Sequence, residues 1–162
     1  MATGSTYTPI ATTTLGSAAS SVSFTSLSAS YTDIQIVFGG AITSGFDAIG
    51  LQFNGDTGTN YSRTYMAGNG TSASSSRDAN QSSIQIGIMG TEQSNSIFHI
   101  MNYANTTTYK TAIARGNSSA NATRAGVGLW RSTSAINRID LLAGSSTFIA
   151  GSTFTLYGIL AA

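Results

Sequence analysis

Cysteine is absent from this sequence of 162 residues, and proline and histidine each occur once. The lack of cysteine excludes disulfides, thiolate zinc ligands and thiol nucleophiles. The single histidine, His99, supplies no closed set of zinc ligands, so we expect no bound metal. Charged residues make up 8% of the chain, whereas about a quarter is usual. The polar groups must therefore come mainly from uncharged side chains, among them the threonines that strands favour.

The seven lysine and arginine residues are scattered along the chain, and the net charge is +1. Binding to nucleic acid requires clustered cations, so we expect no nucleic-acid partner. No apolar run approaches the ~20 residues needed to span a bilayer. The N-terminal MATGSTYTPI also lacks the basic and apolar regions of a secretory signal. We therefore expect no membrane partner and synthesis in a cytoplasm.

Patterns that indicate catalysis are missing. The sequence has no G-x-S-x-G elbow and no glycine-rich nucleotide-binding pattern. Six carboxylates are present, but their spacing gives no reason to pair any two as a glycosidase would require; they are Asp33, Asp47, Asp56, Asp78, Glu92 and Asp140. We expect that the protein is not an enzyme and uses no cofactor.

Apolar residues recur at every second position in several short segments, as in strands with one buried face. The segments are Val22 and Phe24, Ile34 to Phe38, Ile49 to Phe53, Ile84 to Ile88, Val127 and Leu129, and Phe154 to Gly158. We count about ten strands separated by turn residues, and no long helical pattern. The sequence predicts an all-β fold, an antiparallel two-sheet sandwich of jelly-roll type formed by residues 21–162.

Residues 1–20 differ from the rest because they are rich in Thr, Ser and Ala and include the only proline, Pro9. Two alternatives fit this composition. The segment is either an extended arm that reaches a neighbouring molecule or an edge strand, where proline is tolerated.

The stretch from Asn54 to Gly58 combines Asn, Gly, Asp and Thr between two strand patterns. A calcium loop would need a third oxygen ligand at Gly58 and a distant glutamate, which are missing. Asn-Gly supplies positive φ angles, and a glycine soon afterwards permits a bulged hairpin. We interpret the stretch as a turn between strands that end at Phe53 and begin near Asn60, and leave weak cation binding through Asp56 open.

Aromatic side chains offer a second kind of binding site, because sugars stack on exposed rings. The candidates are Tyr61, Tyr65, Tyr103, Tyr109, Trp130 and Tyr157. Packing across a sheet or at subunit contacts is the alternative, and we favour it.

Three runs together resemble small β-sandwich virion proteins of tailed phages: SVSFTSLSASYTDIQIVF, LQFNGDTGTNYSRTY and GSTFTLYGIL. The matching positions are Phe24, Tyr31, Asp33, Leu51, Phe53 to Asp56, Gly58, Asn60, Tyr61, Gly151, Ser152 and Leu156 to Ile159. The proline that these proteins usually carry near Ser28 to Ser30 is missing here, which affects only a turn.

The resemblance implies a virion component made in the host cytoplasm. We expect a capsid decoration (cement) protein that binds the major capsid protein of the assembled head as a homo-oligomer, typically a trimer, on the capsid surface. The alternative is a receptor-binding module of a tail fibre or spike that recognises a cell-surface glycan.

Two sets of contact residues follow from this hypothesis. For the capsid-binding arm we choose Tyr7, Pro9, Ile10 and Leu15. For the subunit interface we choose Trp130 and Arg131, because aromatic residues and arginine are enriched at interfaces.

Overall fold

The structure is a computed structural model that describes residues 6–119 and 122–160, and these ranges contain strands but no helix. The described residues accordingly include no helix that could cross a membrane. The strands are β1 (Tyr7–Thr14), β2 (Ser21–Phe24), β3 (Asp33–Gly40), β4 (Phe46–Asp47), β5 (Gly50–Phe53), β6 (Tyr61–Gly68), β7 (Ala73–Gln81), β8 (Ile84–Gln85), β9 (Met89–Gly90), β10 (Ser94–Ile100), β11 (Lys110–Ser118), β12 (Ala122–Trp130), β13 (Ile139–Leu142) and β14 (Thr153–Ile159).

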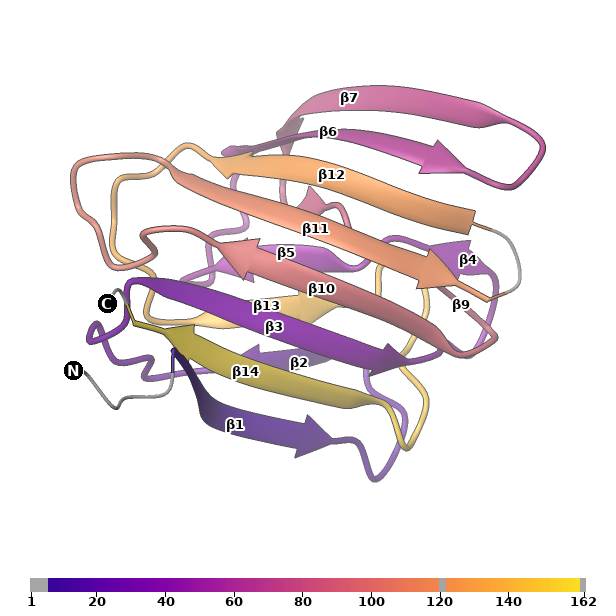
Figure 1. The fold of residues 1–162 in the computed structure, drawn as a ribbon, viewed down its shortest axis with the longest axis horizontal. Coiled ribbons are helices and arrows are strands. Elements are labelled where there is room, and N and C mark those ends of the chain that lie inside the picture. Colours follow the sequence, from indigo (N-terminus) through magenta and orange to yellow (C-terminus); the bar gives the residue numbers. More distant parts are fainter. Residues whose placement is uncertain (1–5, 120–121, 161–162) are drawn as a thin grey trace.

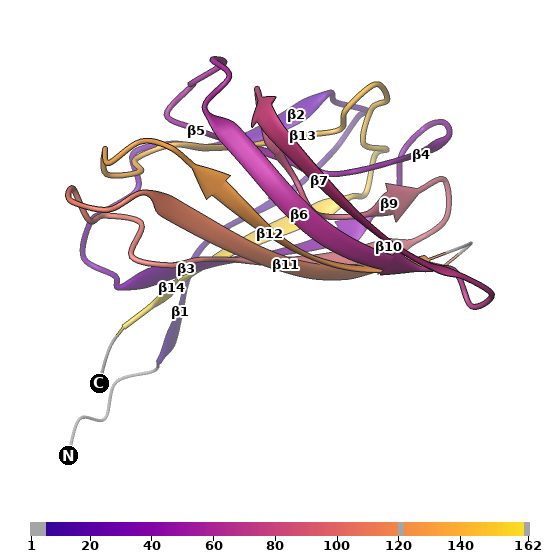
Figure 2. The same cartoon turned by 90° about the horizontal axis from the view of Figure 1, so that it is seen from above.

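The strands form two packed layers of unequal size (Figures 1 and 2). The large sheet has the order β1-β14-β3-β10-β11-β12-β6-β7, and the small sheet has the order β2-β13-β5-β8. A further pair, β4 and β9, lies beside them. All of these pairings are antiparallel. The predicted all-β antiparallel sandwich is therefore confirmed.

The described ranges contain more strands than the ten or so expected from the sequence. The difference lies in very short elements. The predicted strand from Ile84 to Ile88 ends after two residues as β8, and β9 follows as a separate strand in another sheet. Strands this short carry too little alternation to be recognised from sequence.

The core lies between the two layers and forms around the centre of the large sheet. Strand β3 alternates strictly, with Ile34, Ile36 and Phe38 fully buried and the residues between them partly exposed. Phe38 packs against Phe154 on β14, with ring centroids 5.1 Å apart, and against Phe148 at 5.7 Å. Burying a side chain of this size contributes roughly 1.5–3 kcal/mol, so the period-two pattern itself fixes which face of β3 turns inward.

Strands β11 and β12 reverse the usual arrangement, because their small residues face the core. Gly126 and Gly128 are buried, whereas Val127 between them is 47% exposed. The space inside is filled by Ile84 on β8 of the small sheet and by Ile86 just after that strand. A Cβ atom at Gly126 would lie 2.9 Å from Ile86 Cγ2, and one at Gly128 would overlap Ile84. The β12 glycines therefore allow the two layers to approach closely.

Strand β1 is the outermost strand of the large sheet and pairs only with β14. Of the two alternatives for the N-terminal segment, residues 7–14 adopt the edge strand; residues 1–5 lie outside the described part. Six of the eight residues of β1 are exposed and none is fully buried. The strand is thus held mainly by backbone hydrogen bonds to β14. In Figure 2 it stands away from the small sheet.

We predict that Gly128→Ala lowers the free energy of unfolding by about 1–3 kcal/mol, because the added methyl group overlaps Ile84 and forces the layers apart. Urea unfolding measures the effect. The matched control is Gly16→Ala, where an added Cβ meets nothing within 4 Å and the change should stay within about 0.5 kcal/mol. Equal stability of both variants would contradict close contact at Gly128.

Candidate functional site

The turn after β5 begins at Asn54 and Gly55, which have φ angles of 55° and 69°. The backbone N–H of Asp56 donates to the carbonyl of Phe53 at 2.9 Å. The predicted turn between Phe53 and Asn60 is therefore confirmed. The predicted hairpin is wrong, because β5 belongs to the small sheet and β6 to the large one. The chain crosses between the layers at this point.

The side chain of Asn54 is fixed by the loop that precedes β13. Its Nδ2 donates to the carbonyl of Ala135 at 2.8 Å, while its Oδ1 accepts the backbone N–H groups of Asn137 and Arg138 at 2.9 and 3.2 Å. One amide thus satisfies three backbone groups that no strand pairs. This residue ties the crossover to the start of β13.

The carboxylate of Asp56 accepts hydrogen bonds from uncharged donors. Trp130 Nε1 and Asn60 Nδ2 donate to Oδ2 at 2.7 and 2.9 Å, and the backbone N–H of Gly58 donates to Oδ1 at 2.8 Å. The hydrogen bond from Trp130 is the largest of the causes that together lower the pKa of Asp56. Donors that stabilise the charged form hold a carboxylate ionised. The carboxylate thereby joins the turn to the end of β12.

The donor set at Asp56 does not resemble a metal site. No group of three or more His, Asp or Glu residues that could hold a metal occurs among the described residues. At Asp56, N–H groups approach both carboxylate oxygens, and such groups repel a cation. The structure therefore gives the stretch from Asn54 to Gly58 a structural role.

Trp130 lies inside the fold, where only 2% of it is exposed. Its ring stacks on Tyr61, with centroids 6.2 Å apart, and meets Phe53 edge-on at 5.6 Å. Tyr61 is itself buried and donates to the backbone carbonyl of Asp56 at 3.0 Å. The prediction that Trp130 lies at a subunit interface is wrong, because a side chain with this burial offers almost no area to a partner.

Arg131, the second predicted interface residue, is partly exposed and also has contacts within its own chain. Its Nη2 donates to the carbonyl of Thr59 at 2.6 Å and to Oδ1 of Asn80 at 2.9 Å. The guanidinium thereby holds the crossover turn against the end of β7. A role in subunit contact stays a prediction for this residue.

The residues chosen for the capsid-binding arm fall into two groups. Tyr7, Pro9 and Ile10 lie on β1 and are exposed, and Tyr7 meets Tyr157 of β14 edge-on with centroids 6.5 Å apart. Leu15 follows the strand, packs against the core and exchanges backbone hydrogen bonds with Gly151 and Ser152. Leu15 therefore anchors the segment, whereas the first three residues face outward.

Two ionisable side chains, His99 and Lys110, have partners that the sequence did not reveal. His99 is partly buried, and its Nε2 lies 2.8 Å from Oδ2 of Asp33, so the ring has a partner. Lys110 is fully buried and donates to the carbonyls of Thr108 and Thr133 at 2.8 and 3.2 Å. Burial lowers the pKa of Lys110. Nothing in the local sequence distinguishes this lysine from an exposed one.

The candidate sugar-binding aromatics do not gather on one open surface. Tyr61, Tyr103 and Trp130 are buried. Tyr65 lies beneath the guanidinium of Arg124, which is 4.3 Å from its ring centroid. Tyr109 is 55% exposed in the loop before β11. The described aromatics therefore act mainly in packing.

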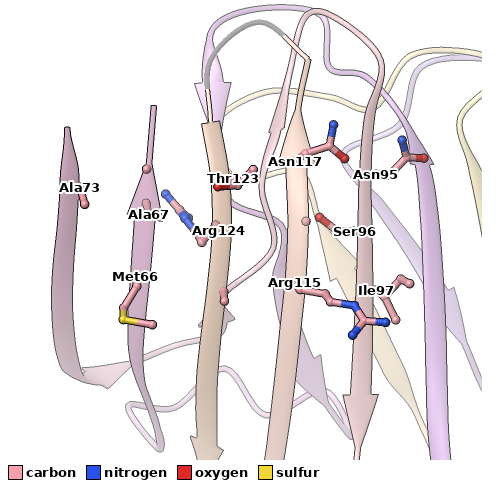
Figure 3. Close-up of a pocket in the computed structure, with 13 residues that line it drawn as sticks. Met66, Ala67, Ala73, Asn95, Ser96, Ile97, Arg115, Asn117, Thr123 and Arg124 are labelled. Atoms are coloured by element: carbon pink, nitrogen blue, oxygen red, sulfur yellow. The ribbon is translucent and has the colours of Figure 1, made fainter. Parts of the chain in front are cut away.

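The sequence did not indicate that apolar side chains gather on the side of the large sheet that faces away from the small sheet. We call this side the outer face, and its central residues are Val37, Met66, Ile97, Ile113, Arg115, Ala125 and Val127. A depression of about 590 Å³ lies at one end of it. Figure 3 shows Met66, Ile97 and Arg115 on one side of this depression and Asn95, Asn117 and Thr123 on the other. The exposed side chains of β11 and β12 form the central part of the outer face.

Comparisons with known proteins add little to this description. No protein-family model and no curated protein matches the chain. Among solved structures, it is similar to a mutant alginate lyase in complex with an alginate tetrasaccharide, with 13% identity and a TM-score of 0.34. The match covers 80% of this chain and 68% of the lyase chain. A likeness of this size bears on neither activity nor partners.

We predict that Trp130→Phe removes a hydrogen bond to a charged group and lowers the free energy of unfolding by about 1.5–3 kcal/mol at neutral pH. Because the pKa of Asp56 is lower in the folded state, its contribution is present above the unfolded pKa and is lost as pH falls through the folded value. The variant should therefore lose less stability than the wild type between neutral pH and about pH 3. Denaturant unfolding at several pH values measures this difference.

Phe53→Leu is the control, because it disturbs the same ring cluster and leaves the hydrogen bond between Trp130 and Asp56 in place. The difference in unfolding free energy between Phe53→Leu and the wild type should be similar at every pH. If acid lowers the free energy of unfolding of Trp130→Phe as much as that of the wild type, the hydrogen bond from Trp130 does not stabilise the Asp56 carboxylate.

Proposed function

We propose that this chain is a structural protein of a tailed-phage virion, a decoration protein that binds the assembled head as an oligomer, with a trimer as the expected form. The observation that carries the proposal is that the edge strand β1 is exposed and uncharged. Six of its eight residues are exposed, and no charged residue occurs before Asp33. An uncharged edge strand can join a neighbouring chain without desolvating an ion.

The residues behind the resemblance to virion proteins also support the proposal. They hold the framework together and do not line a separate site. Asp33 accepts one hydrogen bond from the backbone N–H of Asn102 and contacts His99. A Cβ at Gly158 would overlap the ring of Tyr31, and Asp56 joins the crossover turn to Trp130. The residues that carry the resemblance therefore hold strands and turns of the framework in place, which supports a shared fold.

Attachment through β1 would use backbone groups. The side of β1 away from β14 pairs with no strand among the described residues, so an extended segment of a shell protein can add to it. Pro9 lacks an N–H, and the register shifts between Pro9 and Ala11. The regular part from Ala11 to Thr14 is the segment that fits an added strand. Repetition over many shell sites gives avidity, and binding only to the assembled shell stabilises it by mass action.

We predict that a variant without residues 1–14 folds but no longer co-sediments with empty heads that lack this protein. Among the described residues that it removes, 6–14, none is fully buried, and the deletion keeps Leu15, which packs against the core. Thermal unfolding and circular dichroism should show an intact β-fold. A Thr12→Val variant, which removes one hydroxyl that donates to Thr155, serves as the control and should bind as the wild type does.

Two outcomes would contradict the proposal. One is full-length protein that stays in the supernatant with heads but binds host cells or a surface glycan, as the tail-fibre alternative requires. The other is normal co-sedimentation of the truncated chain, which would show that attachment does not require β1.

A further inference from the structure

The outer face of the large sheet exposes apolar side chains where a solvated sheet normally has polar ones. On β11 the buried positions are Ala112 and Ala114, while Ile113 between them is 43% exposed. Ile113 pairs directly with Val127 of β12. Met66 of β6, next along the sheet, is 66% exposed. The largest aliphatic side chains of this region thus face away from the core.

These residues form one continuous surface. The register places Val37, Ile97, Arg115, Ala125 and Met66 in a single row across β3, β10, β11, β12 and β6. With adjacent strands about 4.8 Å apart, the row is about 19 Å long. A continuous surface on which apolar side chains surround a single charge is of the kind that marks an interaction site.

The charges on the outer face determine which partner fits. Arg115 lies in the middle of the row, and Arg77 of β7 lies at the edge of the same face beside Thr64. Neither guanidinium has a hydrogen-bond or ion-pair partner among the described residues. The carboxylate on this face, that of Asp33, is already paired with His99. The unmatched charge is therefore positive.

A second copy of this chain that used the same face would not match this pattern. Isologous contact brings identical surfaces together, so each Arg115 would meet a surface whose carboxylate is already paired. Bringing an arginine to such an interface without a partner costs free energy. The charge thus favours a different molecule that supplies a carboxylate.

The lining also distinguishes a protein from a sugar. The depression around Arg115 is bounded by Met66, Ile97 and Ala125, with Asn95 and Asn117 at its other side (Figure 3). No aromatic ring lines it, and sugar sites usually offer rings on which a sugar can stack. Methionine and arginine are enriched at protein interfaces. The chemistry is that of a protein contact.

We infer that the outer face is a docking surface for a partner protein that presents a carboxylate among apolar side chains, with Arg115 as the receiving cation. The inference rests on the proposed function, under which the partner is a protein of the virion shell. The carboxylate would bind the Arg115 guanidinium, and its apolar neighbours would cover Ile113, Val127 and Met66. Two attachments then belong to one sheet, β1 at its edge and the outer face at its centre.

The test measures binding of full-length variants to empty heads that lack this protein. Arg115→Ala and Val127→Thr should each weaken binding by about tenfold, a typical effect for a central interface residue. Both side chains are exposed, so unfolding curves should stay close to those of the wild type. Arg77→Ala is the matched control, because it removes the same charge from the edge of the same face and should change binding by less than about threefold.

The outcomes separate the two proposals. If wild-type protein binds heads and Arg115→Ala binds equally well, the docking surface is refuted and the decoration function stands. If Arg77→Ala and Arg115→Ala lose affinity equally, a diffuse positive field replaces a specific site, and the inference fails. If wild-type protein does not bind heads, the proposed function is refuted, and the docking inference that rests on it is refuted with it. Binding of a soluble polyuronate that depends on Arg115 would replace the protein partner by a glycan.

Discussion

Contact between two isoleucine side chains, Ile84 and Ile86, and the glycines of β12 determines how this sandwich is built. Ile84 lies on β8 of the small sheet and Ile86 just after it, and they occupy the space beside Gly128 and Gly126, so this segment fills the core over this part of the large sheet. Because the interior is already close-packed, larger side chains cannot turn inward on β12. Val127 therefore faces solvent. An exposed apolar surface on a protein of low charge follows directly from this packing.

Uncharged hydrogen-bonding groups stabilise charges here, where many other proteins use ion pairs. Asp56 is held by an indole, an amide and a backbone N–H, and Lys110 is held by two backbone carbonyls. In both cases a charge is stabilised by dipoles that the fold already fixes, with no opposite charge that must also be desolvated. The hydrogen bond between Asp56 and Trp130 connects residues that are 74 positions apart in the chain. This contact closes the end of the sandwich where the chain crosses between the layers.

The large sheet offers two surfaces to a partner, its edge at β1 and its outer face, and they lie at different places on the sheet (Figure 1). Its edge at β1 presents backbone groups without charged side chains, whereas its outer face presents aliphatic groups around one arginine. Edge pairing is tolerant of sequence because it uses the backbone, while the face requires a matching shape and charge. A protein that binds repeatedly over a regular shell would use the first for attachment and the second for position.

The sequence alone predicted the elements whose two faces differ strongly. Strand β3 alternates large apolar residues with polar or smaller ones, and the Asn54-Gly55 turn carries its own conformational signal. On β12 the alternation of Gly126 and Gly128 with Val127 and Leu129 predicts a strand, and by hydrophobicity alone it favours the aliphatic side as the buried face, whereas Val127 is exposed. Only the tertiary structure decided the direction. Alternation is a local property of the backbone, whereas the choice of buried face depends on the volume that Ile84 and Ile86, some 40 residues earlier, bring from the other layer.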